Sequence, residues 1–500
     1  MQCRGRKNAE VKLKILFVYQ VASFWPSWDS LYRNCMEDDA IEVKLFRIGG
    51  EQGDHAQMDH SEDFLIKNGI PYEEFTYEKV MAFNPVYMIY QTPYDKGHRP
   101  VETWTARFRS KGIRICYIPY GIEISDTEES RYKHFLLSVV LNAFAVFVLS
   151  DEMRAEYEKH CVNAKAVRAY GLPRFDMLLE PRGLPESYRD KVKGRKIVLW
   201  KLHFPKVFIE NGVKKQATPD LDEYIKFLDY IKKAQDLFFI FMPHPKFADS
   251  TIDAELLPKA QYLLNELQKI ENVYIDMDDD YRASLVNAKA IIIDRSAIMV
   301  EAGVKNVPVL YMYNENYREP MIKPIQNLLD SYYQGTIADD MIRFCEKVRN
   351  GEDDNFEIRK KTFNKCVPYL DGKSAGRIKA YLMDAAETDM ETGMVSEIPK
   401  NSRIVFFGAG YIGMFCLDSM EKKLEIVAFA DNDKTKWNKS YMGYPVVSPE
   451  MIKQLQFDYL VLASDKYYRE IYFQICSLGI PMEKVVNFDH FIVLTQRWSG

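Results

Sequence analysis

One pattern recurs along the chain: a short apolar run is followed by a polar loop and then by an amphipathic helix. This pattern constrains the fold more than any other feature. Short strands that alternate with helices are typical of α/β layers around a parallel sheet. Asp151 is the expected N-cap of the first clear helix, with Ser150 beside it. In the first third we expect strands at Lys14–Tyr19, Val86–Tyr90, Ile113–Ile118 and Ala145–Leu149, and a helix at Asp151–His160.

The same pattern starts again after Gly194. Two such groups indicate two lobes, joined at the segment from Glu180 to Pro185, which is rich in proline and glycine. Ligands of open α/β sheets bind beyond the carboxyl ends of the strands, so we expect the active cleft between the lobes. The second group comprises strands at Lys196–Trp200, Leu237–Met242, Val273–Asp276, Ala290–Ile293 and Val307–Tyr311, and helices at Leu221–Ala234, Asp280–Ala288 and Ser296–Gly303.

Length and composition fit a globular chain of several domains. With 500 residues the chain exceeds what a single core usually serves, and 47% apolar with 28% charged residues argues against long disorder. Helical patterns at Ala338–Val348 and Ala375–Ala386 precede a polar stretch that we interpret as a linker. We divide the chain into an N-terminal lobe (1–180), a second lobe (181–386), a linker (387–401) and an accessory domain (402–500).

The net charge and the cysteine spacing limit which cellular compartments and which kinds of partner suit this chain. A net charge of -5 argues against general affinity for nucleic acids. The eight cysteines lie far apart, without a C-x-x-C pair or clustered histidines, which indicates free thiols in a reducing compartment. No segment reaches the apolar length that spans a bilayer. We predict a cytoplasmic protein, and leave open peripheral contact with the inner face of the cell membrane and homo-oligomerisation.

Residues suited to phosphate binding follow the predicted strands of the middle region. His244 stands between two prolines after the strand Leu237–Met242, and its imidazole can donate to a phosphoryl oxygen. Asp294-Arg295-Ser296-Ala297 opens a helix, whose N–H groups and partial positive charge suit a pyrophosphate. The alternative is that Asp294 or Ser296 only caps this helix.

Two further residues extend this candidate phosphate site. Glu301 lies on the first turns of the same helix, where a carboxylate can accept hydrogen bonds from ribose hydroxyls, although a solvated glutamate would look identical. His203 lies among cations in the loop from Trp200 to Lys206, which suits an anionic ligand.

Together these segments resemble the CDP-glycerol glycerophosphotransferase family, the teichoic-acid polymerases and their relatives in capsule synthesis. Gly171-Leu172-Pro173-Arg174-Phe175-Asp176 matches the family's G-x-P-R-x-D segment, and Pro243-His244-Pro245 matches its H-P element. Asp294 to Glu301 has the spacing of the family's D-Y-S-S-x-x-x-D/E segment, with Pro308 following as in the family. The resemblance covers roughly residues 15–370 and is strongest over 171–311.

The resemblance implies two Rossmann-like lobes of GT-B type and a CDP-activated small-molecule donor. It further implies that a hydroxyl of a polymeric or lipid-linked acceptor attacks the donor phosphate and releases CMP. In the family the residues matching His244 and Ser296 contact the donor pyrophosphate. We accordingly predict a donor-binding set of His203, His244, Arg295, Ser296, Ala297 and Glu301.

The sequence departs from the family in the first lobe. Relatives carry a W-H-G-T-like segment whose histidine is the general base, whereas this chain reads Tyr117-Ile118-Pro119-Tyr120-Gly121-Ile122-Glu123. Glu123 and Asp126 are candidate bases beside His244 in the catalytic set, and Tyr120 and Gly121 are expected on the acceptor side. Ala297 also replaces the family's second serine, so a GT-B glycosyltransferase using another sugar nucleotide stays an alternative.

A glycine motif marks the C-terminal domain, which we expect to be a third, small Rossmann-like unit. Gly408, Gly410 and Gly413 form G-x-G-x-x-G between the strand Arg403–Phe407 and a helix, and Asp431 ends the next strand. This is the context of a dinucleotide fingerprint. The domain also resembles small units appended to surface-polysaccharide enzymes. Nucleotide binding, a structural or regulatory role, and a sugar-nucleotide oxidoreductase are the alternatives.

Two questions stay open from the sequence. Magnesium is a candidate cofactor for pyrophosphate neutralisation, but no acidic cluster requires it, and Asp278-Asp279-Asp280 fits a helix start. A non-catalytic assembly protein is a further alternative, against which the retained donor-site residues argue.

Overall fold

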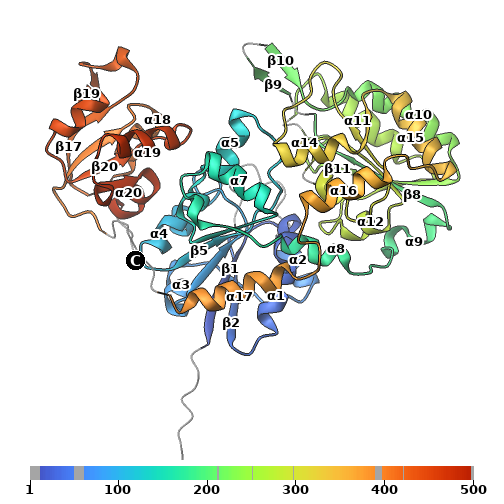
Figure 1. Cartoon of the computed structure of the whole chain (residues 1–500), viewed down its shortest axis with the longest axis horizontal. Helices are drawn as coiled ribbons and strands as arrows, with labels where there is room; N and C mark the ends of the chain where they lie inside the picture. The colour runs from blue at the N-terminus through green and yellow to red at the C-terminus, as the bar shows by residue number, and fades with distance from the viewer. Residues whose placement is uncertain are drawn as a thin grey trace, which may run out of the picture.

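The computed structural model describes residues 12–49, 61–205, 207–210, 213–249, 252–296, 298–388, 397–420 and 422–496 (Figure 1). Within these ranges the strands form three large sheets and one hairpin. The first lobe contains a seven-stranded parallel sheet in the order β3-β2-β1-β4-β5-β6-β7. Its strands are β1 (Leu13–Tyr19), β2 (Ile41–Arg47), β3 (Glu73–Glu74), β4 (Tyr87–Tyr90), β5 (Arg114–Tyr117), β6 (Ala145–Val148) and β7 (Val167–Ala169).

Helices connect these strands and cover the sheet. The 3-10 helices are η1 (Ala22–Ser27), η3 (Val101–Thr103) and η4 (Ala164–Ala166). The α-helices are α1 (Asp29–Met36), α2 (Ser61–Lys67), α3 (Tyr77–Phe83), α4 (Thr105–Arg109), α5 (Glu128–Phe135), α6 (Ser138–Asn142), α7 (Asp151–His160) and α8 (Pro173–Leu179).

The second lobe contains a six-stranded parallel sheet in the order β12-β11-β8-β13-β14-β15. Its strands are β8 (Lys196–Leu202), β11 (Leu237–Pro243), β12 (Val273–Ile275), β13 (Ala290–Ile293), β14 (Val309–Met312) and β15 (Tyr333–Gly335), with a separate antiparallel hairpin of β9 (Val207–Glu210) and β10 (Val213–Gln216). Its helices are α9 (Glu186–Val192), α10 (Leu221–Lys233), α11 (Leu257–Leu267), α12 (Arg282–Asn287), α13 (Ile298–Glu301), α14 (Lys323–Asp330), α15 (Ala338–Asn350) and α16 (Phe356–Cys366).

Strand β11 shows why these apolar runs become central strands. All seven of its residues are buried, because its sequence LFFIFMP is apolar on both faces and helices cover both sides of a parallel sheet. The neighbouring Trp200 of β8 is fully buried and meets Phe241 edge to face, with ring centroids 4.9 Å apart. The register pairs Leu202 with Pro243, so β8 and β11 end side by side and their loops begin together.

Helix α17 (Ser374–Ala386) returns to the first lobe, where it lies against α1 and α8 (Figure 1). Ile378 and Leu382 belong to the apolar cluster that includes the strands of the first lobe, and the Tyr87 hydroxyl of β4 donates to the Leu382 carbonyl at 2.8 Å. The predicted range 181–386 of the second lobe therefore ends on a helix that packs against the first. Periodicity identifies this helix but not the sheet that it covers.

The C-terminal domain contains a six-stranded sheet in the order β18-β19-β17-β16-β20-β21, in which β18 alone is antiparallel among the described strands. Its strands are β16 (Arg403–Phe407), β17 (Glu425–Ala430), β18 (Ser440–Tyr441), β19 (Tyr444–Val447), β20 (Tyr459–Leu462) and β21 (Val485–Asn487). Its helices are α18 (Tyr411–Ser419), η5 (Lys434–Lys436), η6 (Pro449–Gln454), α19 (Tyr468–Ser477), η7 (Met482–Lys484) and α20 (Phe488–Thr495).

This domain packs on the first lobe through α20, which contacts α4. Trp104 and Ala106 of the first lobe are part of the domain's apolar cluster, and the Asn142 amide donates to the Asp489 carboxylate at 2.7 Å. The predicted linker 387–401 overlaps residues 389–396, which lie outside the described residues.

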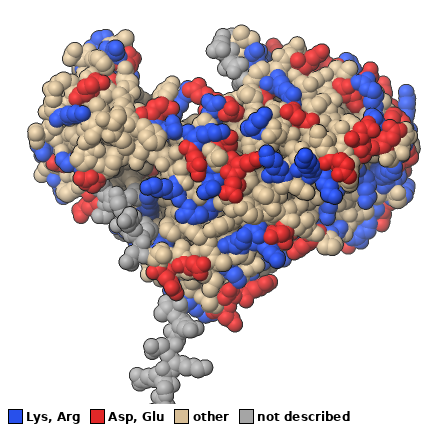
Figure 2. All heavy atoms as spheres, viewed as in Figure 1, with Lys and Arg blue, Asp and Glu red and all other residues tan. Residues whose placement is uncertain are grey.

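The predicted α/β class, with two Rossmann-like lobes and a third small C-terminal Rossmann-like domain, is confirmed. One local prediction is wrong: Ser150, not Asp151, is the N-cap of α7, since its hydroxyl accepts from the Met153 amide at 3.2 Å. No helix in the described ranges is long and apolar enough to cross a membrane. Basic and acidic side chains are interspersed over the visible face (Figure 2).

Candidate functional site

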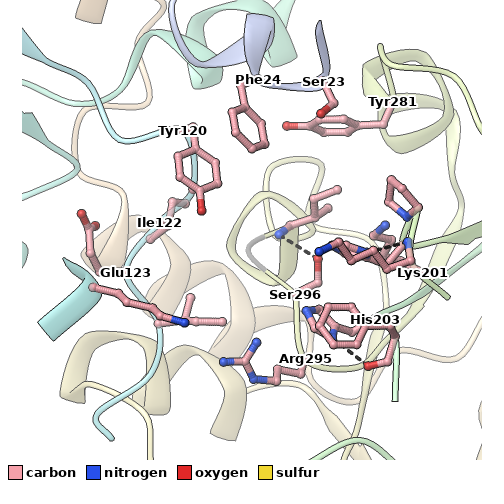
Figure 3. A pocket seen from close by; sticks show the side chains of 18 of the residues that line it. Ser23, Phe24, Tyr120, Ile122, Glu123, Lys201, His203, Tyr281, Arg295 and Ser296 are labelled. Atoms are coloured by element: carbon pink, nitrogen blue, oxygen red, sulfur yellow. Dashed lines mark hydrogen bonds between the residues drawn. The ribbon is translucent and has the colours of Figure 1, made fainter. Parts of the chain in front are cut away.

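A cavity of about 730 Å³ lies between the two lobes (Figure 3). Much of its lining comes from segments that follow strand ends: those after β1, β4 and β5 in the first lobe, and those after β8, β11, β12, β13 and β14 in the second. Helices α5 and α8 contribute further lining residues. Because all these strands are parallel, their carboxyl ends open toward one cleft. The cavity brings together the predicted residues Tyr120, Gly121, Glu123, His203, His244, Arg295 and Ser296.

Two histidines form the second-lobe side of this cavity. The His203 and His244 rings lie 4.9 Å apart between centroids, because β8 and β11 are adjacent and end together. The Lys246 amide donates to Nδ1 of His244 at 3.1 Å, which favours the neutral tautomer with the proton on Nε2. Burial, with His244 nearby, lowers the pKa of His203 well below its usual value, so this imidazole is neutral near pH 7.

Asp294 and Lys201 lie behind the histidines. The Asp294 carboxylate is fully buried and accepts the His203 backbone N–H at 2.7 Å, so it holds the loop after β8. Burial raises the pKa of Asp294 to about 8 and lowers the pKa of Lys201 to about 8. Lys201 lines the cavity, although the sequence reasoning did not assign it to the site.

Arg295 and Ser296 lie in the loop between β13 and α13. The Arg295 guanidinium pairs with both oxygens of Glu319, which also accepts from the Ser125 hydroxyl at 2.6 Å. This network fixes a cation at the cavity wall. The Ser296 hydroxyl accepts from the Ile298 amide at 3.4 Å, which is a long contact at the start of α13. The capping role of Ser296 stays a prediction. Ala297 lies outside the described residues.

Glu301 lies beside the cavity rather than among its lining residues. Its carboxylate is fully buried, 3.0 Å from an Arg174 nitrogen, and accepts from the Tyr281 hydroxyl at 2.5 Å. Arg174 and Tyr281 themselves line the cavity. The structure thus shows Glu301 in an internal ion pair, and its contact with a ribose stays a prediction.

The segment Gly171 to Asp176 has a structural explanation. Arg174 reaches the cavity, as described above, while Asp176 accepts backbone N–H groups of Ser374 and Ala375 at 3.0 and 2.8 Å. These groups are the first turn of α17, whose orphan donors need an acceptor. Asp176 therefore ties α17 to the first lobe.

Glu123 and Asp126, the two candidate bases, lie in different surroundings. Glu123 lines the cavity, is only 4% exposed and accepts from the Tyr157 hydroxyl at 2.5 Å. Burial raises the pKa of Glu123 to about 7. Asp126 is absent from the described cavity lining and pairs with Arg131 at 2.8 Å. Of the two candidates, only Glu123 is among the described residues that line the cavity, and the Tyr157 hydroxyl holds its carboxyl.

Several lining residues were missed by the sequence reasoning. Phe24, Tyr94 and His98 follow β1 and β4, and their position after predicted strands was the signal available for finding them. His134 on α5 also lines the cavity, and burial lowers its pKa to about 4. It belongs to a helix that carries no such signal.

The acidic run Asp278-Asp279-Asp280 precedes a helix, but it does not form the predicted acidic first turn. Helix α12 begins at Arg282 with Tyr281 as its N-cap, and Asp280 pairs with the Arg282 side chain at 2.7 Å. Among the described residues, no group of three or more His, Cys, Asp and Glu side chains has an arrangement that could hold a metal ion. The involvement of magnesium stays an open prediction.

The glycine motif of the C-terminal domain is set by close packing. Gly408 has φ +125°, and a Cβ there would lie 2.3 Å from the Ala463 carbonyl oxygen; a Cβ at Gly413 would lie 2.4 Å from the oxygen of Gly408. Gly410 would meet nothing within 4 Å. Asp431 accepts the Ala409 N–H at 2.9 Å, so its carboxylate engages the loop itself. Nucleotide binding by Gly408, Gly410, Gly413 and Asp431 stays a prediction.

A protein-family model matches part of the chain, and solved structures of similar fold match most of it. Residues 400–486 match the family described as C2185-like, N-terminal. No curated protein matches the sequence.

Solved structures resemble the two lobes. A protein described as a UDP-N-acetylglucosamine 2-epimerase from Listeria monocytogenes aligns with a TM-score of 0.51 and 14% identity, over 76% of this chain and 98% of that one. The UDP-GlcNAc-bound UDP-GlcNAc 2-epimerase of Neisseria meningitidis aligns with a TM-score of 0.49 and 12% identity, over 74% of this chain and 100% of that one. A variant of the wall teichoic acid polymerase TagF aligns with a TM-score of 0.49 and 11% identity, over 76% of this chain and 90% of that one. The Listeria match shows the GT-B fold of the lobes.

Proposed function

We propose that this chain is a transferase that moves a glycerol-phosphate or related polyol-phosphate group from a CDP-activated donor to a hydroxyl of a cell-surface polymer or its lipid-linked precursor. The observation that carries the proposal is one cavity with histidine and arginine side chains, which could donate to a phosphate, on one wall and a buried carboxyl on the other. His203, His244 and Arg295 form the first wall and Glu123 belongs to the second. The ordered motif matches with the glycerophosphotransferase family support the choice of donor.

The donor pyrophosphate would lie against the second-lobe wall. Nε2–H of His244 can donate to a phosphoryl oxygen, and the guanidinium of Arg295, which Glu319 holds in place, can donate its remaining N–H groups. Catalysis of this kind depends on positioning and on stabilising the charge of the transferring phosphoryl group. Hydrogen-bond donors positioned at this wall therefore suit a reaction at phosphorus.

Glu123 is the proposed general base. Its carboxylate takes the proton of the acceptor hydroxyl, and the acceptor oxygen then forms a bond to the donor phosphorus that carries the polyol. The bond between the two phosphates breaks and CMP leaves with the electron pair. A pKa of about 7 suits this task, since a base is most effective near the working pH.

Product analysis tests the proposal. The full chain is incubated with CDP-glycerol and a hydroxyl acceptor, and the nucleotide products are separated by chromatography. Polyol-phosphate transfer releases CMP, whereas glycosyl transfer from a sugar nucleotide releases the nucleoside diphosphate. Release of a diphosphate from a sugar nucleotide, with no CMP from any CDP-polyol, would reject the proposal in favour of a glycosyltransferase.

Two histidine variants sharpen this experiment. We expect His244→Ala to reduce CMP release about 100-fold or more, because a transition-state hydrogen bond to the phosphoryl group is lost. His160 does not line the cavity and stacks on Phe135, so His160→Ala is the matched control and should retain activity. Full activity in a folded His244→Ala variant would refute the role of His244.

A further inference from the structure

Four rings form a continuous aromatic strip on the first-lobe wall of the cavity. Phe24 stacks on Tyr120 with centroids 4.0 Å apart, the Tyr120 and Tyr94 hydroxyls lie 2.8 Å apart, and Tyr94 stacks on His98 at 4.5 Å. All four line the cavity, and they come from three separate loops. Phe24 and Tyr120 lie side by side, across the site from Lys201 and His203 (Figure 3).

The strip differs from the core aromatics beside it. Trp25 and Trp28, next to Phe24 in the chain, are 3% and 0% exposed and pack into the first-lobe core. Phe24, Tyr94 and Tyr120 are only half-buried and face the cavity. Leaving large apolar rings in contact with water costs free energy, and lining by aromatic rings with a few polar groups is typical of a ligand site.

The charges on this wall disfavour an anionic occupant. Its cations are already paired: Lys133 lies 2.7 Å from Glu129, and Arg174 lies 3.0 Å from Glu301. Glu123 adds a carboxyl to the same wall. A chain of phosphodiesters would be repelled by the carboxyl groups of Glu123 and Glu129, which line the cavity, whereas a neutral ligand would not be repelled.

We infer that the aromatic strip is a subsite for a neutral pyranose ring, so that the acceptor hydroxyl of the proposed reaction is carried by a saccharide rather than by a polyol-phosphate chain. The inference about the acceptor rests on the proposed function. The C–H face of a pyranose is apolar and slightly positive, and packs on the negative face of an aromatic ring. Its hydroxyls find partners in Ser23 and the Tyr94 phenol, with Glu123 on the same wall.

Saturation-transfer difference NMR on the full chain tests the subsite without any reaction. The probes are methyl pyranosides of glucose, galactose, mannose and N-acetylglucosamine, with glycerol and glycerol 3-phosphate for comparison. We expect saturation of the ring protons of at least one pyranoside and none of glycerol 3-phosphate. Phe24→Ala and Tyr120→Leu should each weaken this binding about tenfold, since each removes one stacking ring.

Phe473 supplies the matched control, because it is a partly exposed ring on α19 of the C-terminal domain. Phe473→Ala should leave the pyranoside signal unchanged. Absence of signal from every pyranoside, a signal that survives both strip variants, or a preference for glycerol 3-phosphate would overturn the inference. CDP binding is measured separately by calorimetry. If the chain binds a pyranoside but does not bind CDP, the proposed donor is rejected and the pyranose subsite is retained.

Discussion

Glu123 is the residue whose ionisation governs the proposed chemistry. A carboxyl accepts a proton only when ionised, and burial raises its pKa to about 7. Turnover should therefore rise with pH through about 7 and level off above it. We expect Glu123→Gln to lower the rate by about 10²–10⁴-fold and to remove this rising limb from the profile of kcat/KM against pH.

Asp126 provides the control for this profile. Asp126→Asn removes a carboxyl close in sequence that pairs with Arg131 and is absent from the described cavity lining. This variant should keep the limb near pH 7. A limb that persists in Glu123→Gln and disappears in Asp126→Asn would reverse the assignment.

Sequence reasoning reached the residues that follow strands and missed those placed by tertiary contacts. His203, His244 and Arg295 follow strands whose apolar runs are plain in the sequence, so their convergence could be expected. The burial of Glu301 against Arg174 joins residues that are remote in sequence, and no local pattern encodes it. His134 is likewise brought to the cavity by the packing of α5.

At the scale of elements, the turn between β16 and α18 offers a test of why its glycines are there. Gly408→Ala forces a Cβ to 2.3 Å from a backbone oxygen at a φ of +125°. We expect it to destabilise the C-terminal domain by on the order of 2–4 kcal/mol in denaturant unfolding. Gly410→Ala meets no atom within 4 Å and should cost about 1 kcal/mol or less. Equal effects of the two variants would contradict the packing explanation.

Helix α17 gives the second prediction at this scale. Asp176→Ala removes the acceptor of two backbone N–H groups at the start of α17 and should lower the free energy of unfolding by about 1–2 kcal/mol. Asp38 also contacts α17, through the more exposed Lys379, so Asp38→Ala should cost about 1 kcal/mol or less. Chemical denaturation measures both, and a larger loss in Asp38→Ala would contradict the anchoring role of Asp176.

The boundaries of many strands and helices could be predicted from the sequence, whereas the surfaces against which they pack could not. The strands Ala290–Ile293 and Arg403–Phe407 begin and end where the apolar runs predict. The short edge strand β15 and the β9–β10 hairpin lack a long apolar run and were not predicted. The placement of α17 on the first lobe depends on which apolar surface remains uncovered, which is a property of the assembled fold.

At the scale of the whole molecule, the C-terminal domain covers apolar surface of the first lobe and reaches the cavity rim. Trp104 is 3% exposed beneath the domain, and Lys466 pairs at 2.9 Å with Glu128, which lines the cavity. Removal of the domain therefore uncovers an apolar patch. We expect a fragment of residues 1–388 to bind the dye ANS more strongly than the full chain and to self-associate; unchanged dye binding would show that the interface is dispensable.

The central claim is that the cavity holds a cytidine diphosphate donor. Calorimetric titration of the full chain with CDP, CMP, UDP, GDP and NAD, repeated with His244→Ala, tests it most directly. The account predicts selective binding of CDP or CMP that weakens about tenfold or more in the histidine variant. Binding of NAD without binding of any cytidine nucleotide would contradict it and favour the oxidoreductase alternative.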